Sequence, residues 1–197
     1  MKTTFEVSEP VKKINHYLLK FSTILSFLLP PAIISGPFFS DLIVSLVALS
    51  FIFRSILNNN FYWMKNDIII ILLVFYIYIV FGSLISEYIE NSLSSSLFYF
   101  RFIFFAAALA WWILPNLKSN KLIYYLILLS YLFVLIDGFI QYYFGKDLFG
   151  YPLQTYHVSG PFGKDLVLGK YLAIWSAVIT GFLITKTIFK KEMLISS

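Results

Sequence analysis

Long apolar runs alternate with short polar connections along the whole chain. A helix that crosses a bilayer needs about 20 mostly apolar residues, because the hydrocarbon core is about 30 Å thick and each helical residue adds about 1.5 Å. Several runs approach that length, and the run over 68–85 carries no charge. The pattern predicts an all-α polytopic membrane helix bundle with six transmembrane helices, at 17–34, 38–53, 68–85, 97–114, 122–144 and 166–189.

The composition supports a membrane protein and excludes several other classes. Of the 197 residues, 59% are apolar and 13% are charged, whereas a soluble domain is about a quarter charged. A chain of this size cannot bury such an excess in one water-soluble core. The chain has no cysteine. A soluble enzyme, a disordered chain and a secreted disulfide scaffold are therefore excluded.

The basic residues predict that both termini are cytoplasmic. Eleven of the 15 Lys and Arg residues fall at the two ends or in the second and fourth connections, and three fall on the other side. Cytoplasmic connections carry the excess of Lys and Arg. We expect a cytoplasmic leader at 1–16, a six-helix transmembrane domain at 17–189 and a cytoplasmic tail at 190–197. The net charge of +5 then needs no nucleic-acid partner.

Three polar residues inside the predicted spans are candidates for function. Arg101 lies about one turn from the outer end of the fourth span, and Asp137 lies about two turns from the outer end of the fifth. Because consecutive spans are antiparallel, these two side chains are expected to meet in the outer half of the bilayer, where an ionisable group is costly. Gln141 extends the polar face of Asp137 by one turn. The alternative is a pair that only locks two helices.

The outer connection at 145–165 is the second candidate, since loops of about this length are uncommon unless they are functional or disordered. Glycines before a helix start leave backbone N–H groups free to bind an anion. Here they are Gly160 and Gly163, beside Ser159, with His157 and Lys164 as further donors. A phosphate or diphosphate group suits this place, although a Gly-Pro turn before a helix is usually no more than a turn.

The sequence assigns no metal, cofactor or catalytic residue. Its two histidines lie on opposite predicted faces, which is incompatible with a histidine-based metal site. No Walker loop, dinucleotide-binding fingerprint or nucleophile elbow is present. We therefore expect no bound metal and no cofactor.

Two stretches of polar and glycine positions resemble the O-antigen ligase and polymerase family of bacterial envelope proteins. The family pattern D-x-x-x-Q-x-x-x-G-x-D-x-x-G is matched at Asp137, Gln141, Gly145, Asp147 and Gly150. The pattern S-G-x-F-G-x-x-x-x-x-G-x-x-L is matched at Ser159, Gly160, Phe162, Gly163, Gly169 and Leu172. The other spans are similar in hydropathy and order. The chain departs from the family at His157, where arginine is common as a contact to the donor diphosphate.

The resemblance implies a multi-pass protein of the bacterial inner membrane. A glycan linked to undecaprenyl diphosphate would be handled at the periplasmic face, in lipopolysaccharide or surface polysaccharide assembly. It further implies that the chain corresponds to the N-terminal part of the family, which is about twice as long and carries its catalytic residues in the second half. Two other classes stay open: a six-helix transporter subunit, with Arg101 and Asp137 lining a solute path, and a non-catalytic membrane scaffold.

The charge asymmetry generates a topology prediction. A reporter fused after Gly150 should be periplasmic, and one fused after Asn116 should be cytoplasmic, because cytoplasmic connections hold the excess of Lys and Arg. Paired alkaline phosphatase and green fluorescent protein fusions measure this. A cytoplasmic signal at Gly150 would overturn the topology and the outer site with it.

Overall fold

In the computed structural model, residues 9–117, 121–154, 157–163, 165 and 167–195 are described, with side chains described as far as residue 184. The chain forms two compact units. The first unit contains residues 1–29 and 40–118, and the second contains residues 30–39 and 119–197. Each unit is described by itself below.

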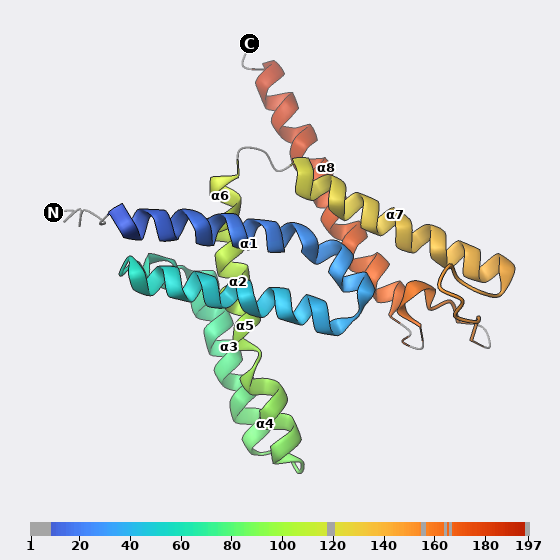
Figure 1. The fold of residues 1–197 in the computed structure, drawn as a ribbon, viewed down its shortest axis with the longest axis horizontal. Coiled ribbons are helices and arrows are strands. Elements are labelled where there is room, and N and C mark those ends of the chain that lie inside the picture. The colour runs from blue at the N-terminus through green and yellow to red at the C-terminus, as the bar shows by residue number, and fades with distance from the viewer. Residues whose placement is uncertain (1–8, 118–120, 155–156, 164, 166, 196–197) are drawn as a thin grey trace. The chain divides into compact units, whose positions relative to one another are not determined.

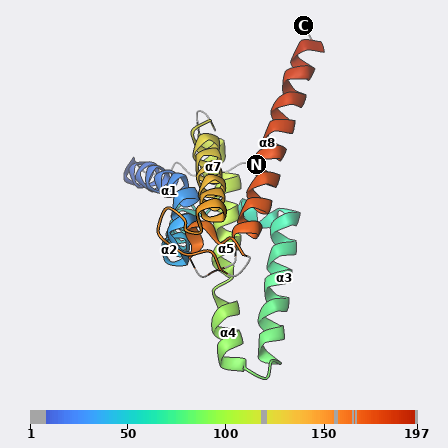
Figure 2. The same cartoon turned by 90° about the vertical axis from the view of Figure 1, so that its right-hand side faces the viewer.

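The described residues are mostly helical and form no named strand, which confirms the all-α prediction. Two isolated antiparallel bridges, Lys146 with Pro152 and Gln154 with His157, lie between the last two long helices. Figures 1 and 2 show the helices from two directions. Their bounds are α1 Glu9–Ser35, α2 Pro37–Leu57, α3 Asp67–Leu84, α4 Ile89–Leu97, α5 Phe100–Ala108, α6 Leu114–Asn116, α7 Lys121–Phe144 and α8 Leu168–Ile195. Short 3-10 turns occupy Tyr62–Lys65 and Gly160–Phe162, and a π-helical turn occupies Leu109–Ile113.

Within the described residues, five helical segments are long and apolar enough to cross a membrane: α1, α2, α3, the run Ile89–Asn116 and α7. In α8 the described apolar part is shorter, at Leu168–Ile184. Large apolar side chains on these helices are not covered by other parts of the chain. On α3, for example, the exposed fraction is 66% for Ile71 and 72% for Tyr78. Exposed apolar faces of this kind fit lipid contact. The count of six membrane spans and the cytoplasmic position of both termini stay predictions.

Several helix bounds differ from the hydropathy prediction because polar turns are also helical. α1 begins at Glu9, inside the expected leader, and an ion pair of 2.8 Å joins Lys12 to Glu9 across its first turn. α1 also continues through the Pro30-Pro31 pair to Ser35, so the pair does not end the helix. α8 likewise extends into the expected tail, since it ends at Ile195.

The fourth expected span begins eight residues early, as the separate helix α4. Serine hydroxyl groups of α4 form hydrogen bonds within the helix: those of Ser94 and Ser95 both donate to the backbone carbonyl of Asn91 at 3.0 Å. Such bonds to the preceding turn allow serine inside a helix. α4 packs beside α3, as both views show. A scan for apolar runs misses this helix because six of its nine residues are polar.

An aromatic cluster forms the core of the first unit. The ring of Phe51 on α2 lies 5.1 Å from that of Trp63 and 6.0 Å from that of Trp112. The indole N–H of Trp63 donates to Ser55 Oγ at 3.2 Å, and the Arg54 guanidinium lies 5.4 Å from the Trp112 ring. These contacts join α2, the turn before α3 and the π-helical turn, and the Trp63 indole both packs its apolar body and binds its polar atom.

The second unit is built on the contact between α7 and α8. Val134, Leu168 and Tyr171 are buried there. Gly138 of α7 allows the close approach, since a Cβ at this position would lie 3.2 Å from a methyl carbon of Leu168. The connection at 145–167 lies beside the end of α7, and its 3-10 turn Gly160–Phe162 contacts that helix.

Candidate functional site

Gln141, in the last two turns of α7, is the central residue of the candidate site. Its side chain is fully buried, and its Oε1 atom accepts hydrogen bonds from the backbone N–H groups of Ser159 and Gly160, each at 2.8 Å. Its amide nitrogen donates to Ser159 Oγ at 3.2 Å and to the Tyr151 carbonyl at 3.3 Å. One side chain thus binds two separate parts of the loop between α7 and α8.

Asp137 lies one turn before Gln141 and binds the start of the same loop. Its Oδ1 accepts from the backbone N–H of Leu148 at 2.9 Å. Its Oδ2 is buried and has no hydrogen-bond partner among the described residues. Gly160 lies beside it: a Cβ there would come within 3.6 Å of Asp137 Oδ2 and 3.0 Å of Leu168. With φ of +57° as well, only glycine fits this position without strain.

Asp147 folds the first part of the loop into a tight turn. Its Oδ1 accepts from the N–H groups of Phe149 (3.0 Å) and Tyr151 (2.6 Å), and Gly150 turns the chain with φ of +87°. The side chain of Asp147 is 6% exposed. The N–H groups of residues 148, 149 and 151 therefore all bond to buried carboxylates, as residues of this kind do in turns.

The remaining loop candidates occupy different environments. Gly163 has φ of +66°, and its carbonyl accepts from the Gln154 amide at 3.3 Å. His157 is exposed, and within the described part of the chain its imidazole makes no hydrogen bond. Lys164 lies outside the described residues. Among the candidates in the described part of the loop, His157 has a side-chain polar group that is available to a ligand.

The expectation that Ser159 and Gly160 present free N–H groups to an anion is wrong. Both groups donate to Gln141 Oε1. An amide oxygen can replace an anion because it accepts two hydrogen bonds through its two lone pairs. Sequence reasoning placed Gln141 on the correct face but did not show that its side chain would reach these two residues.

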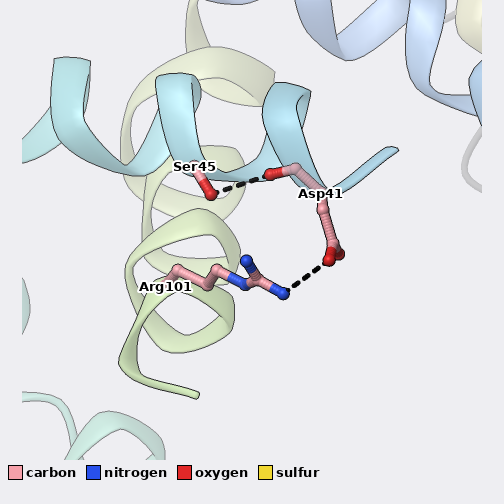
Figure 3. A network of polar contacts seen from close by, with 3 residues as sticks. All are labelled: Asp41, Ser45 and Arg101. Carbon is pink, nitrogen blue, oxygen red and sulfur yellow. Dashed lines mark hydrogen bonds and ion pairs between the residues drawn. The ribbon is translucent and has the colours of Figure 1, made fainter. Parts of the chain in front are cut away.

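The structure gives Arg101 a partner other than the expected Asp137, which lies in the other unit, so a contact between Arg101 and Asp137 stays a prediction. Arg101 Nη2 instead binds Asp41 Oδ2 of α2 at 2.8 Å, inside the first unit (Figure 3). Asp41 is held in turn on a regular helix, where Ser45 Oγ donates to its backbone carbonyl at 2.7 Å. Asp41 also lies near the outer end of a predicted span, so depth alone did not choose between the two carboxylates. The half-exposed Asp41 costs less to desolvate than the fully buried Asp137.

Two hollows flank the loop in the second unit. The larger has a volume of about 690 Å³ and a mostly apolar lining, formed by Pro31, Ile34, Ser35, Leu129, Ser130, Phe133, Phe149, Tyr151 and Pro161. The smaller, of about 320 Å³, lies on the Gly138 side of α7 and is lined by Leu135, Gly138, Phe139, Tyr142, Tyr143, Val158, Leu168 and Leu172. The described residues contain no group of three or more His, Asp or Glu side chains that could hold a metal ion.

Comparison with known proteins yields no match: no family model, no curated protein and no solved structure is similar to this chain.

Replacing Gln141 should release the loop. Gln141→Ala removes two short hydrogen bonds and leaves two buried N–H groups without a partner, which costs about 2–4 kcal/mol of unfolding free energy. Limited proteolysis of the detergent-purified protein should then cut faster between residues 145 and 165. Gln154→Ala is the control, because Gln154 supplies a single longer bond, to Gly163. Equal cleavage rates in both variants would contradict this role for Gln141.

The ion pair in the first unit should show energetic coupling. Arg101→Ala and Asp41→Ala should each lower thermal stability, and the double variant should lose less than their sum by about 1 kcal/mol, since the pair is partly exposed. A cycle of Arg101→Ala with Asp137→Ala is the control and should be additive. Coupling in the second cycle and additivity in the first would reverse the assignment of partners.

Proposed function

We propose that this chain is the N-terminal part of an O-antigen ligase-like or polymerase-like protein of the bacterial inner membrane. It would handle a glycan linked to undecaprenyl diphosphate at the periplasmic face. The observation that carries the proposal is the hydrogen-bonded loop at the end of α7. Among the positions that resemble the family pattern, Gln141 bonds to Ser159 and Gly160, and Asp137 lies beside Gly160. Asp137 and Asp147 each accept from backbone N–H groups of the same loop.

This network gives the resemblance a physical meaning. Asp137 and Gly160 lie side by side although 23 positions separate them in the sequence, and this proximity supports the proposal. The described part of the loop is hydrogen-bonded to the end of an apolar helix, which is where the headgroup of a lipid-linked substrate would lie. The loop residues with buried polar groups hold the loop in place, and recognition of the ligand falls to exposed groups such as His157.

The larger hollow supports a lipid-linked substrate. Its lining combines apolar residues of α1 and α7 with Phe149 and Tyr151 of the loop. A mostly apolar hollow beside the loop suits the hydrocarbon chain of such a substrate. A transporter subunit would instead need a continuous polar path, whereas the Gln141 carboxamide and Asp137 Oδ1 are bonded to the loop.

Binding of the carrier tests the proposal. The purified chain in nanodiscs should bind undecaprenyl diphosphate weakly and should transfer no sugar when it is alone, because the resemblance places the catalytic residues in a second half. His157→Ala should weaken binding severalfold without changing thermal stability, since the imidazole is exposed and forms no hydrogen bond in the described part. Microscale thermophoresis with a fluorescent carrier measures this.

His16 is the matched control. It is the other histidine of the chain, it is exposed at the start of α1, and the charge pattern puts it on the cytoplasmic side. His16→Ala should leave binding unchanged. If neither substitution alters binding, or if the wild-type protein binds no carrier, the proposed function fails. Sugar transfer by the isolated chain would show that its catalytic residues lie within these 197 residues.

A further inference from the structure

A small polar hollow in the first unit lies at the start of α3, apart from the candidate site. It has a volume of about 180 Å³ and is lined by Tyr62, Lys65, Asn66, Asp67 and Trp111. α3 is one of the helices able to cross a membrane, so its first turn lies where the hydrocarbon meets the headgroups. Trp and Tyr are enriched at this depth. The hollow is thus at the level of lipid headgroups.

The hollow contains one positive and one negative side chain that are not paired. Lys65 and Asp67 both line it. Within the described part of the chain, however, the ion pairs are Lys12 with Glu9 and Arg101 with Asp41. Asn66 caps α3, because its Oδ1 accepts from the N–H of Ile68 at 3.0 Å. Lys65 and Asp67 are both exposed and stand on either side of the capping residue Asn66, so their charges are available to a ligand.

A ligand for this hollow needs two opposite charges a short distance apart. Lys65 would donate to a phosphate oxygen, and Asp67 would accept from an ammonium group; hydrogen bonds between charged groups are about twice as strong as neutral ones. The rings of Tyr62 and Trp111 supply faces that attract a cation. We propose that the hollow binds the phosphoethanolamine headgroup of a phosphatidylethanolamine molecule in the surrounding bilayer.

The two charges distinguish this lipid from the alternatives. Phosphatidylglycerol has the phosphate but no ammonium group, so Asp67 would face an anion. A quaternary choline headgroup has no N–H to donate to the carboxylate. The volume of about 180 Å³ accommodates several water-sized groups, which is the scale of one headgroup and not of a lipid-linked sugar chain. The proposal is independent of the function assigned to the loop in the second unit.

Lipid retention by the purified full chain tests the proposal. Native mass spectrometry after titration with dioleoyl phosphatidylethanolamine or dioleoyl phosphatidylglycerol gives an affinity for each. The wild-type protein should prefer the ethanolamine lipid by about tenfold, the effect of one charge-assisted hydrogen bond. Asp67→Asn should remove this preference, and Lys65→Gln should weaken the binding of both lipids by about tenfold.

Lys13→Gln is the matched control, since it removes one exposed lysine on the same predicted face without touching the hollow, and it should bind like the wild type. Equal affinities of wild type and both pocket variants would overturn the proposal. So would an unchanged preference in Asp67→Asn, because the carboxylate would then play no part. Soluble phosphoethanolamine is a further arm: binding of this compound without binding of the lipid would show that the source is not the bilayer.

Discussion

The loop between α7 and α8 depends on the carboxamide of Gln141. This side chain is fully buried and binds Ser159, Gly160 and Tyr151 at once. In a bilayer, backbone N–H groups without a partner are especially costly, because no water is present to bind them. A loop can lie against a membrane helix only when such groups are satisfied by the protein. Gln141 and Asp137, one turn apart on α7, satisfy them from a single helix face.

The two units use buried polar groups in different ways. In the second unit, Asp137, Gln141 and Asp147 bind backbone groups of a loop and so convert a long connection into an ordered structure. In the first unit, Arg101 binds a carboxylate of another helix, and Trp63 binds a serine hydroxyl within an aromatic core. The first arrangement shapes a surface, whereas the second joins helices.

The structural roles of the loop residues change how the candidate site is understood. Residue types that suggest anion binding from sequence are here occupied in holding the loop, and the glycines provide positive φ angles and close contacts. The groups left for a ligand are the exposed His157 and the walls of the adjoining hollow. The proposed carrier site and the proposed headgroup hollow lie in different units, and each rests on its own set of contacts.

Much of the architecture follows from the sequence alone. Apolar runs of nearly bilayer length determine the all-helical class and the positions of the long helices, because burial in lipid requires each segment to satisfy its own backbone bonds. The same scan could not find the polar turns of α1, α4 and α8, whose helical structure depends on ion pairs, on serine hydroxyl bonds and on continuation of an existing helix. Only the tertiary structure decided the partners of the polar side chains. Depth in the membrane made Asp41 and Asp137 similar candidates for Arg101, and a spacing of 18 residues does not reveal that Gln141 reaches Ser159. Such choices depend on which helices are neighbours and on how the loop folds back, and neither is encoded in the period of one helix.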